Sequence, residues 1–242
     1  MSVVDFHTHI LPGIDDGSAS TEESIAMLRQ EEQQGIRHIV ATPHFYADRD
    51  TPERFLSRRQ AAAQQLRDAI DRQQWSLSPQ LRLGAEVYYF RGISEWDALE
   101  ELAIEGTSCI LIEMPSPPWT EQMYRELERI AFHRGLTPII AHIDRYIAPL
   151  RTYGIPKRLG KLPVLVQANA SFFLHPNTRR MALRMLKRGE IHLLGSDCHD
   201  LTDRAPNLQR AVQAIQRKPG DNDFQSVEYY QARVLDGKDP LW

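Results

Sequence analysis

The stretch VVDFHTH (residues 3–9) is a short apolar run that ends in a His-x-His pair. The run is continuous rather than alternating, which is typical of a strand buried on both faces of a parallel sheet. Six similar runs follow along the chain: HIVAT (38–42), LRLGAEV (81–87), CILIE (109–113), PIIAH (138–142), PVLVQAN (163–169) and IHLLGS (191–196). The sequence therefore predicts about seven parallel strands.

Helical patterns separate these runs and cover 20–34, 52–73, 120–134, 177–188 and 206–216. The first pattern begins at Ser20, a residue type that caps helix N-termini, and stops at Gly35. Strands that alternate with helices favour a parallel sheet with right-handed crossovers. We expect an α/β fold, a β/α barrel, with a doubly wound open sheet as the alternative.

The bulk composition is that of an ordinary globular chain. Of the 242 residues, 42% are hydrophobic and 25% are charged, with no repeat or flexible linker, so we expect one domain over residues 1–242. The net charge of -3 provides no general attraction to nucleic acid or to an anionic membrane. The N-terminus lacks a signal-peptide pattern, and no run approaches the ~20 apolar residues of a membrane span. We expect a cytoplasmic protein without membrane insertion.

Imidazoles and carboxylates occur at the ends of six of these runs. In a parallel β/α barrel the carboxyl ends of the strands meet on one face, where active sites lie. The candidate metal ligands are His7, His9, Asp16, His44, Glu86, Glu113, His142, Asp197 and His199. This set is too large for one ion, and nitrogen and oxygen donors without thiolates suit manganese, iron or zinc. We predict a site for two or three ions, and we expect His38, His133, His175 and His192 to lie outside it.

The segment GSDCHDLTDR (195–204) also permits another interpretation. Five residues separate Cys198 from Arg204, the spacing of phosphatases in which a thiolate attacks phosphorus. The intervening HDLTD has no glycine to form a phosphate cradle, and Asp200 and Asp203 would repel a dianion and raise the thiol pKa. We therefore favour a metal-binding corner over a cysteine nucleophile.

Six segments together resemble one known enzyme family. They are DFHTHILPGIDDG (5–17), ATPH (41–44), GAEVYY (84–89), LIEM (111–114), IAHIDRY (141–146) and GSDCH (195–199). They are similar to the motifs of the PHP superfamily (polymerase and histidinol phosphatase). Within it, they most resemble the bacterial manganese-dependent protein-tyrosine phosphatases of capsular and exopolysaccharide loci (the CpsB/YwqE type). The resemblance implies a distorted (β/α)7 TIM-like barrel with a three-metal cluster.

The resemblance also implies a role for each candidate residue. The first ion would be held by His7, His9, Glu86 and Asp197. The second would be held by Glu86, Glu113 and His142, and the third by Asp16, His44 and His199. Arg145 and Arg204 would grip the phosphate, and Asp197 or a neighbouring histidine would donate the proton. Paired ions ~3.5–4 Å apart would supply a bridging hydroxide that attacks phosphotyrosine.

The implied substrate is a phosphotyrosine-containing protein, a bacterial tyrosine kinase that regulates polysaccharide synthesis and export. A PHP phosphatase of a small phosphomonoester, such as histidinol phosphate, is the alternative. The net negative charge argues against a nucleic-acid-binding or nuclease module. The full set of candidate ligands argues against a non-catalytic metal-stabilised scaffold. The oligomeric state stays open.

Two further expectations concern the surroundings of the site. Residues 87–90 (Val-Tyr-Tyr-Phe) and Trp119 follow the third and fourth strands and could wall a pocket for a phenyl ring. The basic run formed by Arg54, Arg58 and Arg59 is expected to be a solvated helix face.

Overall fold

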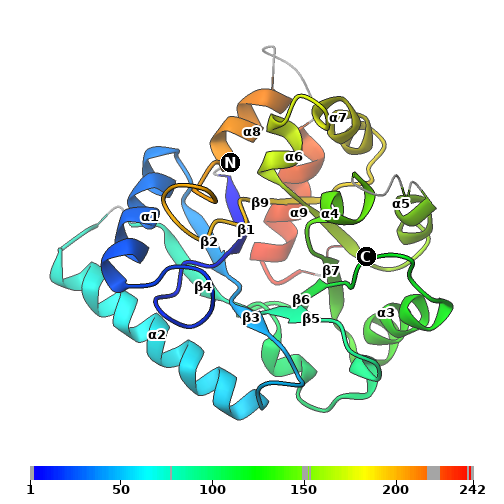
Figure 1. Ribbon diagram of the computed structural model, residues 1–242, viewed down its shortest axis with the longest axis horizontal. Helices are drawn as coiled ribbons and strands as arrows, with labels where there is room; N and C mark the ends of the chain where they lie inside the picture. The colour runs from blue at the N-terminus through cyan, green and yellow to red at the C-terminus, as the bar shows by residue number, and fades with distance from the viewer. Residues whose placement is uncertain are drawn as a thin grey trace.

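The computed structural model describes residues 3–76, 78–148, 152, 154–216, 224–238 and 240. Its strands are β1 (Val4–Thr8), β2 (His38–Ala41), β3 (His44–Phe45), β4 (Gln80–Leu83), β5 (Glu86–Tyr88), β6 (Cys109–Glu113), β7 (Thr137–Ile140), β8 (Leu165–Asn169) and β9 (Leu193–Gly195). All seven apolar runs of the sequence therefore form strands. Helices surround the strands at the perimeter of the molecule (Figure 1).

The strands form one curled parallel arrangement from two hydrogen-bonded groups, β1-β2-β4 and β3-β5-β6-β7-β8-β9. The strand predicted at 81–87 is broken into two pieces at 84–85, and the strand predicted at 38–42 is followed, after a break at 42–43, by the short β3. Backbone bonds from Gly84 N to Ala41 O (2.8 Å) and from Glu86 N to Pro43 O (3.0 Å) carry the pairing across both breaks. A parallel bridge between Thr8 and Cys198 joins the first strand to the segment after β9. The sheet curls, which the open doubly wound alternative would not do.

The long outer helices lie close to their predicted positions. They are α1 (Thr21–Gln33), α2 (Pro52–Arg72), α3 (Glu121–Arg134), α7 (Arg179–Lys187) and α8 (Leu208–Ile215). The Ser20 hydroxyl accepts from Glu23 N at 3.2 Å, which caps α1 as expected. Gly135 ends α3 with a φ of 65°, a left-handed conformation that glycine adopts without strain.

Several short elements were not predicted. They are the 3-10 helices η1 (Ile93–Glu95) and η2 (Leu99–Leu102), and the helices α4 (Ile143–Ile147), α5 (Gly154–Leu159) and α6 (Ala170–Leu174). Among the residues that the structure describes, α5 lies in the segment between α4 and β8.

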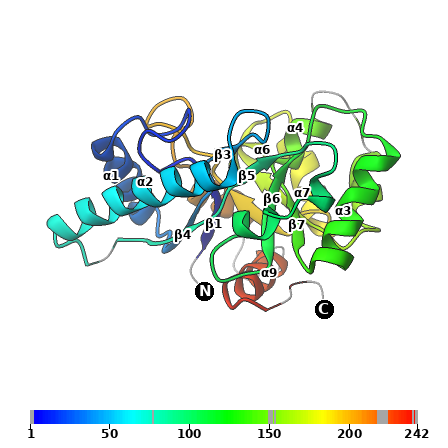
Figure 2. The same cartoon turned by 90° about the horizontal axis from the view of Figure 1, so that it is seen from below.

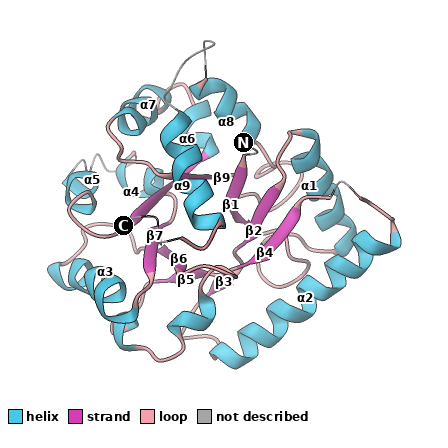
Figure 3. Cartoon of the chain, turned by 180° about the vertical axis from the view of Figure 1, so that it is seen from behind, coloured by secondary structure: helices cyan, strands magenta, loops and turns pink. Residues whose placement is uncertain are grey.

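The helix α9 (Gln225–Leu235) was also missed, and it lies across the amino ends of the strands (Figures 2 and 3). Its Val234 belongs to the apolar cluster inside the curled sheet, together with Phe6 and Leu111. The Gln231 side chain accepts from Val4 N at 3.2 Å. The amino end of the sheet is thus closed by packing, which leaves the carboxyl end for the site.

Candidate metal centre

All nine predicted ligands lie together at the carboxyl end of the curled sheet. His7 and His9 lie at the end of β1, Glu86 begins β5 and Glu113 ends β6. His44 begins β3, and the other four, Asp16, His142, Asp197 and His199, come from the loops that follow β1, β7 and β9. Parallel strands bring these ends to one edge, so residues far apart in the sequence become neighbours.

Glu86 occupies the middle of this cluster and is almost completely buried. Its Oε2 lies 3.1 Å from His7 Nε2 and 3.0 Å from His44 Nδ1. Its Oε1 lies 2.7 Å from His142 Nε2. The Glu86 carboxylate therefore contacts side chains from β1, from β3 and from the loop after β7.

One subset combines the His-x-His pair with the loop after β9. His7 Nε2 and His9 Nε2 lie 3.5 and 3.6 Å from the same oxygen, Asp197 Oδ1. Asp197 reaches this position with a φ of 55°, and His142 has a φ of 30°. Non-glycine residues rarely adopt this left-handed region, and such strain concentrates at functional sites.

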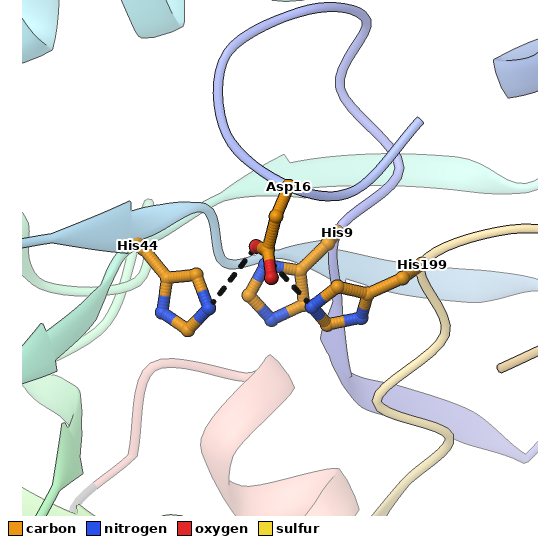
Figure 4. A group of neighbouring side chains, drawn as sticks. All are labelled: His9, Asp16, His44 and His199. Atoms are coloured by element: carbon orange, nitrogen blue, oxygen red, sulfur yellow. Dashed lines mark ion pairs between the residues drawn. The ribbon is translucent and has the colours of Figure 1, made fainter. Parts of the chain in front are cut away.

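A second subset lies nearer the surface, where Asp16 stands between two imidazoles (Figure 4). Asp16 Oδ1 lies 3.3 Å from His44 Nε2 and 3.5 Å from His199 Nε2. The ring of His9 lies behind them, with its centroid 3.8 Å from that of His199. This is the set that the resemblance assigns to the third ion, with His9 added.

The donors fit a cation. Three groups have donor atoms within 4.8 Å of one another: His9, Asp16, His44 and His199; His7, His9 and Asp197; and His44, Glu86 and Glu113. Glu86 Oε2 and His199 Nε2 are buried without a hydrogen-bond partner among the described residues. Buried polar atoms without partners cost free energy, and a bound cation would satisfy them. The third group contains His44 where the resemblance expects His142, so the assignment of ligands to particular ions stays a prediction.

Electrostatics in the cluster favour a positive charge. Burial alone would lower the pKa of His9, but its hydrogen bond to Asp15 and the negative charge of Glu86 raise it to about 10. Burial and the nearby charge of Glu86 raise the pKa of Glu113 to about 7. Without a cation the site therefore retains protons, which metal binding would displace.

Supporting side chains fix the candidate ligands, and the sequence analysis did not assign them this role. Asp15 accepts from His9 Nδ1 at 2.8 Å and from His44 N at 3.0 Å. Gln167 Oε1 accepts from His142 N at 2.6 Å, and Asn169 Nδ2 donates to Asp197 Oδ2 at 2.9 Å. Both of the latter lie at the end of β8. Buried polar residues at the end of that apolar run were the available signal. Partners of this kind orient metal ligands.

Arg145 and Arg204 approach the cluster from its rim, with side chains 40% and 37% exposed. Arg145 Nη2 donates to Asp197 Oδ2, and Arg204 Nη2 donates to Asp197 Oδ1 at 2.7 Å. Burial would raise the pKa of Asp197, but the charges of His7 and Arg145 hold it well below its usual range. An ionised Asp197 suits a metal ligand better than a proton donor, so the donor role stays an untested prediction.

Cys198 is not placed to act as a nucleophile. Its side chain is completely buried, and its backbone carbonyl accepts from His9 N at 2.9 Å. Burial and the charges of Glu31 and Asp5 raise its pKa well above the usual value. The geometry favours the metal-corner interpretation of the loop.

The expectation of a solvated basic face holds for Arg54 and Arg58, whose side chains are exposed, and is wrong for Arg59, which is half-buried. Arg58 donates to Ile14 O at 3.1 Å and to the carboxylate of Asp50, and Arg59 donates to Gly84 O at 2.7 Å. These side chains tie α2 to loops near the site. Sequence reasoning missed this because the partners are backbone carbonyls far away in the chain.

The comparison with known proteins agrees with this geometry. A family model described as "Capsular polysaccharide synthesis, CpsB/CapC" matches residues 3–235. The chain belongs to the CpsB/CapC family. The family predicted from the sequence is thereby confirmed.

Relatives in the CpsB/CapC family are similar over most of their length. The chain is 31% identical to the tyrosine-protein phosphatase CpsB of Streptococcus pneumoniae, covering 90% of this chain and 91% of the relative. It is 31% identical to the putative tyrosine-protein phosphatase CapC of Staphylococcus aureus, covering 95% and 86%. The predicted enzyme class, a phosphoric monoester hydrolase specific for phosphotyrosine, is that of these relatives.

A solved structure supports the fold of this CpsB/CapC chain. It comes from crystal structures of YwqE from Bacillus subtilis and CpsB from Streptococcus pneumoniae, described as metal-dependent tyrosine phosphatases. It superposes with a TM-score of 0.84 at 23% identity, covering 98% of this chain and 95% of the other. At this identity the match establishes the fold.

Proposed function

We propose that the chain is a metal-dependent protein-tyrosine phosphatase. The observation that carries the proposal is one cluster of nitrogen and oxygen donors around Glu86, with Arg145 and Arg204 at its rim. The naming of its relatives as tyrosine-protein phosphatases supports the same activity. We further propose that residues 1–242 form one domain, a distorted (β/α)7 barrel.

The proposed cations are Mn²⁺, up to three of them, with iron or zinc as the other metals that suit these donors. The proposed ligands are the nine residues His7, His9, Asp16, His44, Glu86, Glu113, His142, Asp197 and His199. When bound, the cations would activate water as the nucleophile and neutralise charge on the phosphoryl group. Glu86, which lies within 3.3 Å of four of the histidines, would be shared by two of the ions.

Arg145 and Arg204 would hold the phosphoryl oxygens. A guanidinium can donate two parallel hydrogen bonds to a phosphate, and both arginines retain exposed surface on the open side of the cluster. In the structure their donors are directed to Asp197, so a phosphate would share them with that carboxylate. Asp197, held ionised by the charges of His7 and Arg145, would keep the two arginines in place.

An aromatic cleft next to the cluster supports a tyrosyl substrate. The cleft has a volume of about 540 Å³ and is lined by Tyr46, Ala47, Asp48, Arg49, Tyr88, Tyr89 and Phe90. The rings of Tyr46 and Tyr88 lie 5.6 Å apart, and that of Tyr46 lies 5.4 Å from His44. A phenyl ring would pack here with its phosphate at the cluster. Trp119, expected in this wall, instead lies buried with its indole N–H bonded to Pro115 O.

The leaving group is consistent with the same substrate. A phenol has an ordinary pKa of about 10 and leaves with less protonation than the alkoxide of serine. A strong general acid is therefore less important for phosphotyrosine. The reduced need for a general acid is consistent with an ionised Asp197, which accepts hydrogen bonds from both Arg145 and Arg204.

The proposed protein substrate is a phosphotyrosine-containing protein, a tyrosine kinase that regulates polysaccharide synthesis or export, in the cytoplasm. No helix among the described residues is both long and apolar enough to cross a membrane. The family description, capsular polysaccharide synthesis, supports this setting.

The test compares kcat/KM for a phosphotyrosyl peptide, a phosphoseryl peptide and histidinol phosphate, with Mn²⁺ present. We expect the phosphotyrosyl peptide to be preferred by at least tenfold. Faster hydrolysis of histidinol phosphate would replace this proposal with a small-metabolite phosphatase.

A further inference from the structure

A second cleft opens directly beside the metal-ligand cluster. It has a volume of about 500 Å³ and is lined by Ile14, Asp15, Asp16, His44, Tyr46, Arg49, Asp50, Arg54 and Arg58. Asp16 and His44 belong to the ligand cluster, while the arginines come from the β3–α2 loop and the start of α2. A substrate bound at the cluster would therefore have this basic cleft immediately beside it.

The carboxylates of the cleft are already engaged. Asp15 bonds to His9, and Asp16 lies between His44 and His199. The third carboxylate of the cleft, Asp50, forms ion pairs with Arg54 Nε (3.1 Å) and with Arg58 Nη2. One carboxylate is thus shared between two guanidiniums.

Arg49 adds a third positive charge. Its guanidinium lies over the Tyr46 ring, 4.6 Å from the centroid, and no ion pair links it to a carboxylate within the part of the chain that the structure describes. Tyr46 and Arg49 also line the aromatic cleft, so they form the boundary between the two clefts. The arginine-lined end therefore has more positive than negative charge.

The arginines differ in their freedom. Arg58 is fixed because it also donates to Ile14 O, which ties α2 to the loop after β1. Arg54 is 72% exposed and has only Asp50 as its ion-pair partner among the described residues. Arg49 and Arg54 are therefore the two side chains that can turn toward a ligand without losing a structural bond to a loop.

We propose that this arginine cleft, defined by Arg49, Arg54 and Arg58, binds an acidic side chain next to the phosphotyrosine of the substrate. The inference rests on the proposed function and deepens it by naming the substrate class, tyrosine-phosphorylated segments with flanking Asp or Glu. An extended peptide advances ~3.3 Å per residue, so a neighbour one to three positions away can reach the cleft.

The expected effect is modest and dependent on salt. Ion pairs at exposed sites are weak, so each flanking carboxylate should improve kcat/KM by about threefold to fivefold. Since exposed charges are screened over ~10 Å at 0.1 M salt, the preference should shrink as the ionic strength rises.

The experiment uses two phosphotyrosyl peptides that differ only in flanking residues, Glu in one and Gln in the other. It compares the full-length wild-type protein with the double variant Arg49→Gln, Arg54→Gln. Arg72→Gln at the far end of α2 is the matched control. The first readout is the ratio of kcat/KM values with Mn²⁺. The second is binding of the fluorescent peptides to chelator-treated protein, measured by anisotropy.

We expect the wild type and Arg72→Gln to prefer the acidic peptide in both readouts, and the double variant to lose the preference. Equal binding of the two peptides by the wild type would overturn the inference, even if both are hydrolysed. If the wild type does not hydrolyse either peptide but still binds the acidic one more tightly, the result would count against the proposed function and support the arginine cleft. Thermal unfolding of each variant identifies any that does not fold, in which case Arg49→Gln alone replaces the pair.

Discussion

Glu86 Oε1 lies 2.7 Å from His142 Nε2, at the centre of the ligand cluster. The other oxygen of the same carboxylate lies 3.1 Å from His7 Nε2. Glu86 is the first residue of β5, which begins where the third predicted strand is broken. The break in the strand therefore places this carboxylate at the centre of the ligand cluster.

Glu86→Gln keeps the shape of this side chain and removes its charge. We expect cation affinity to fall at least about 100-fold, because even residues that only orient metal ligands change affinity 10- to 100-fold. Bound metal after gel filtration and phosphotyrosyl-peptide hydrolysis are the measurements. Glu126→Gln, a buried carboxylate outside the cluster that accepts from Gly92 N, is the control and should retain its metal. Normal metal content in Glu86→Gln would contradict the bridging role.

Gly195→Ala should disturb the cluster without removing a donor. A Cβ at Gly195 would lie 2.6 Å from the Cβ of His7 and 2.8 Å from Gln167 Nε2. Such overpacking costs roughly 1–3 kcal/mol, so we expect lower thermal stability and weaker Mn²⁺ binding by calorimetry. Gly160→Ala, where the nearest atom is Pro156 O at 3.5 Å, should behave like the wild type. Equal Mn²⁺ affinity in both variants would show that His7 can move freely.

Arg145→Gln and Arg204→Gln should separate phosphate binding from metal binding. If each guanidinium stabilises charge on the phosphoryl group, kcat/KM should fall about 100- to 1000-fold while metal content stays near normal. Arg→Lys at either position should recover only part of the activity, because an ammonium cannot donate two parallel bonds. Arg180→Gln on the exposed surface of α7 is the control. Loss of metal together with activity would instead mean that the arginines only hold Asp197.

The pH dependence of stability should contain a contribution from Glu31. This side chain is completely buried, and neither of its oxygens nor Asp5 Oδ2 has a hydrogen-bond partner within the described chain. Two ionised carboxylates cannot bond to each other. Burial, and then the charge of Asp5, raises the pKa of Glu31 well above 4.5.

The sign of the effect follows from linkage. The folded protein retains a proton that the unfolded chain releases near pH 4.5, so this contribution to stability is full below that pH and disappears as the pH rises through the folded pKa. In Glu31→Gln the free energy of unfolding should fall less as the pH rises, so this variant should be more stable than the wild type at pH 8. Denaturant unfolding of chelator-treated protein at several pH values measures it. Parallel pH profiles for the two proteins would show that Glu31 does not retain this proton in the folded state.

The sequence was sufficient for the strands because each is a continuous apolar run. It could not predict the breaks at 42–43 and 84–85, which depend on how the whole sheet curls. It also missed α9, because Gln231 interrupts the apolar face and finds its partner, Val4 N, at the opposite end of the chain.

The candidate ligands were predictable because their types recur at strand ends. Neighbouring residues were harder to distinguish, as Asp15 and Asp16 illustrate. The Asp15 side chain is only 7% exposed and orients His9, whereas that of Asp16 is 65% exposed and faces the outer imidazoles. The loop after β1 determines this difference, and its backbone path depends on contacts with residues far away in the sequence. The contact of Arg58 with Ile14 O was not predictable for the same reason, because the two residues are far apart in the sequence.

The most direct measurement is phosphotyrosyl-peptide hydrolysis by chelator-stripped protein, with and without added Mn²⁺, on the wild type and Cys198→Ser in parallel. We predict that stripping abolishes activity, that Mn²⁺ restores it, and that Cys198→Ser behaves like the wild type. Activity that survives stripping but disappears in Cys198→Ser would contradict the metal cluster as the centre of catalysis.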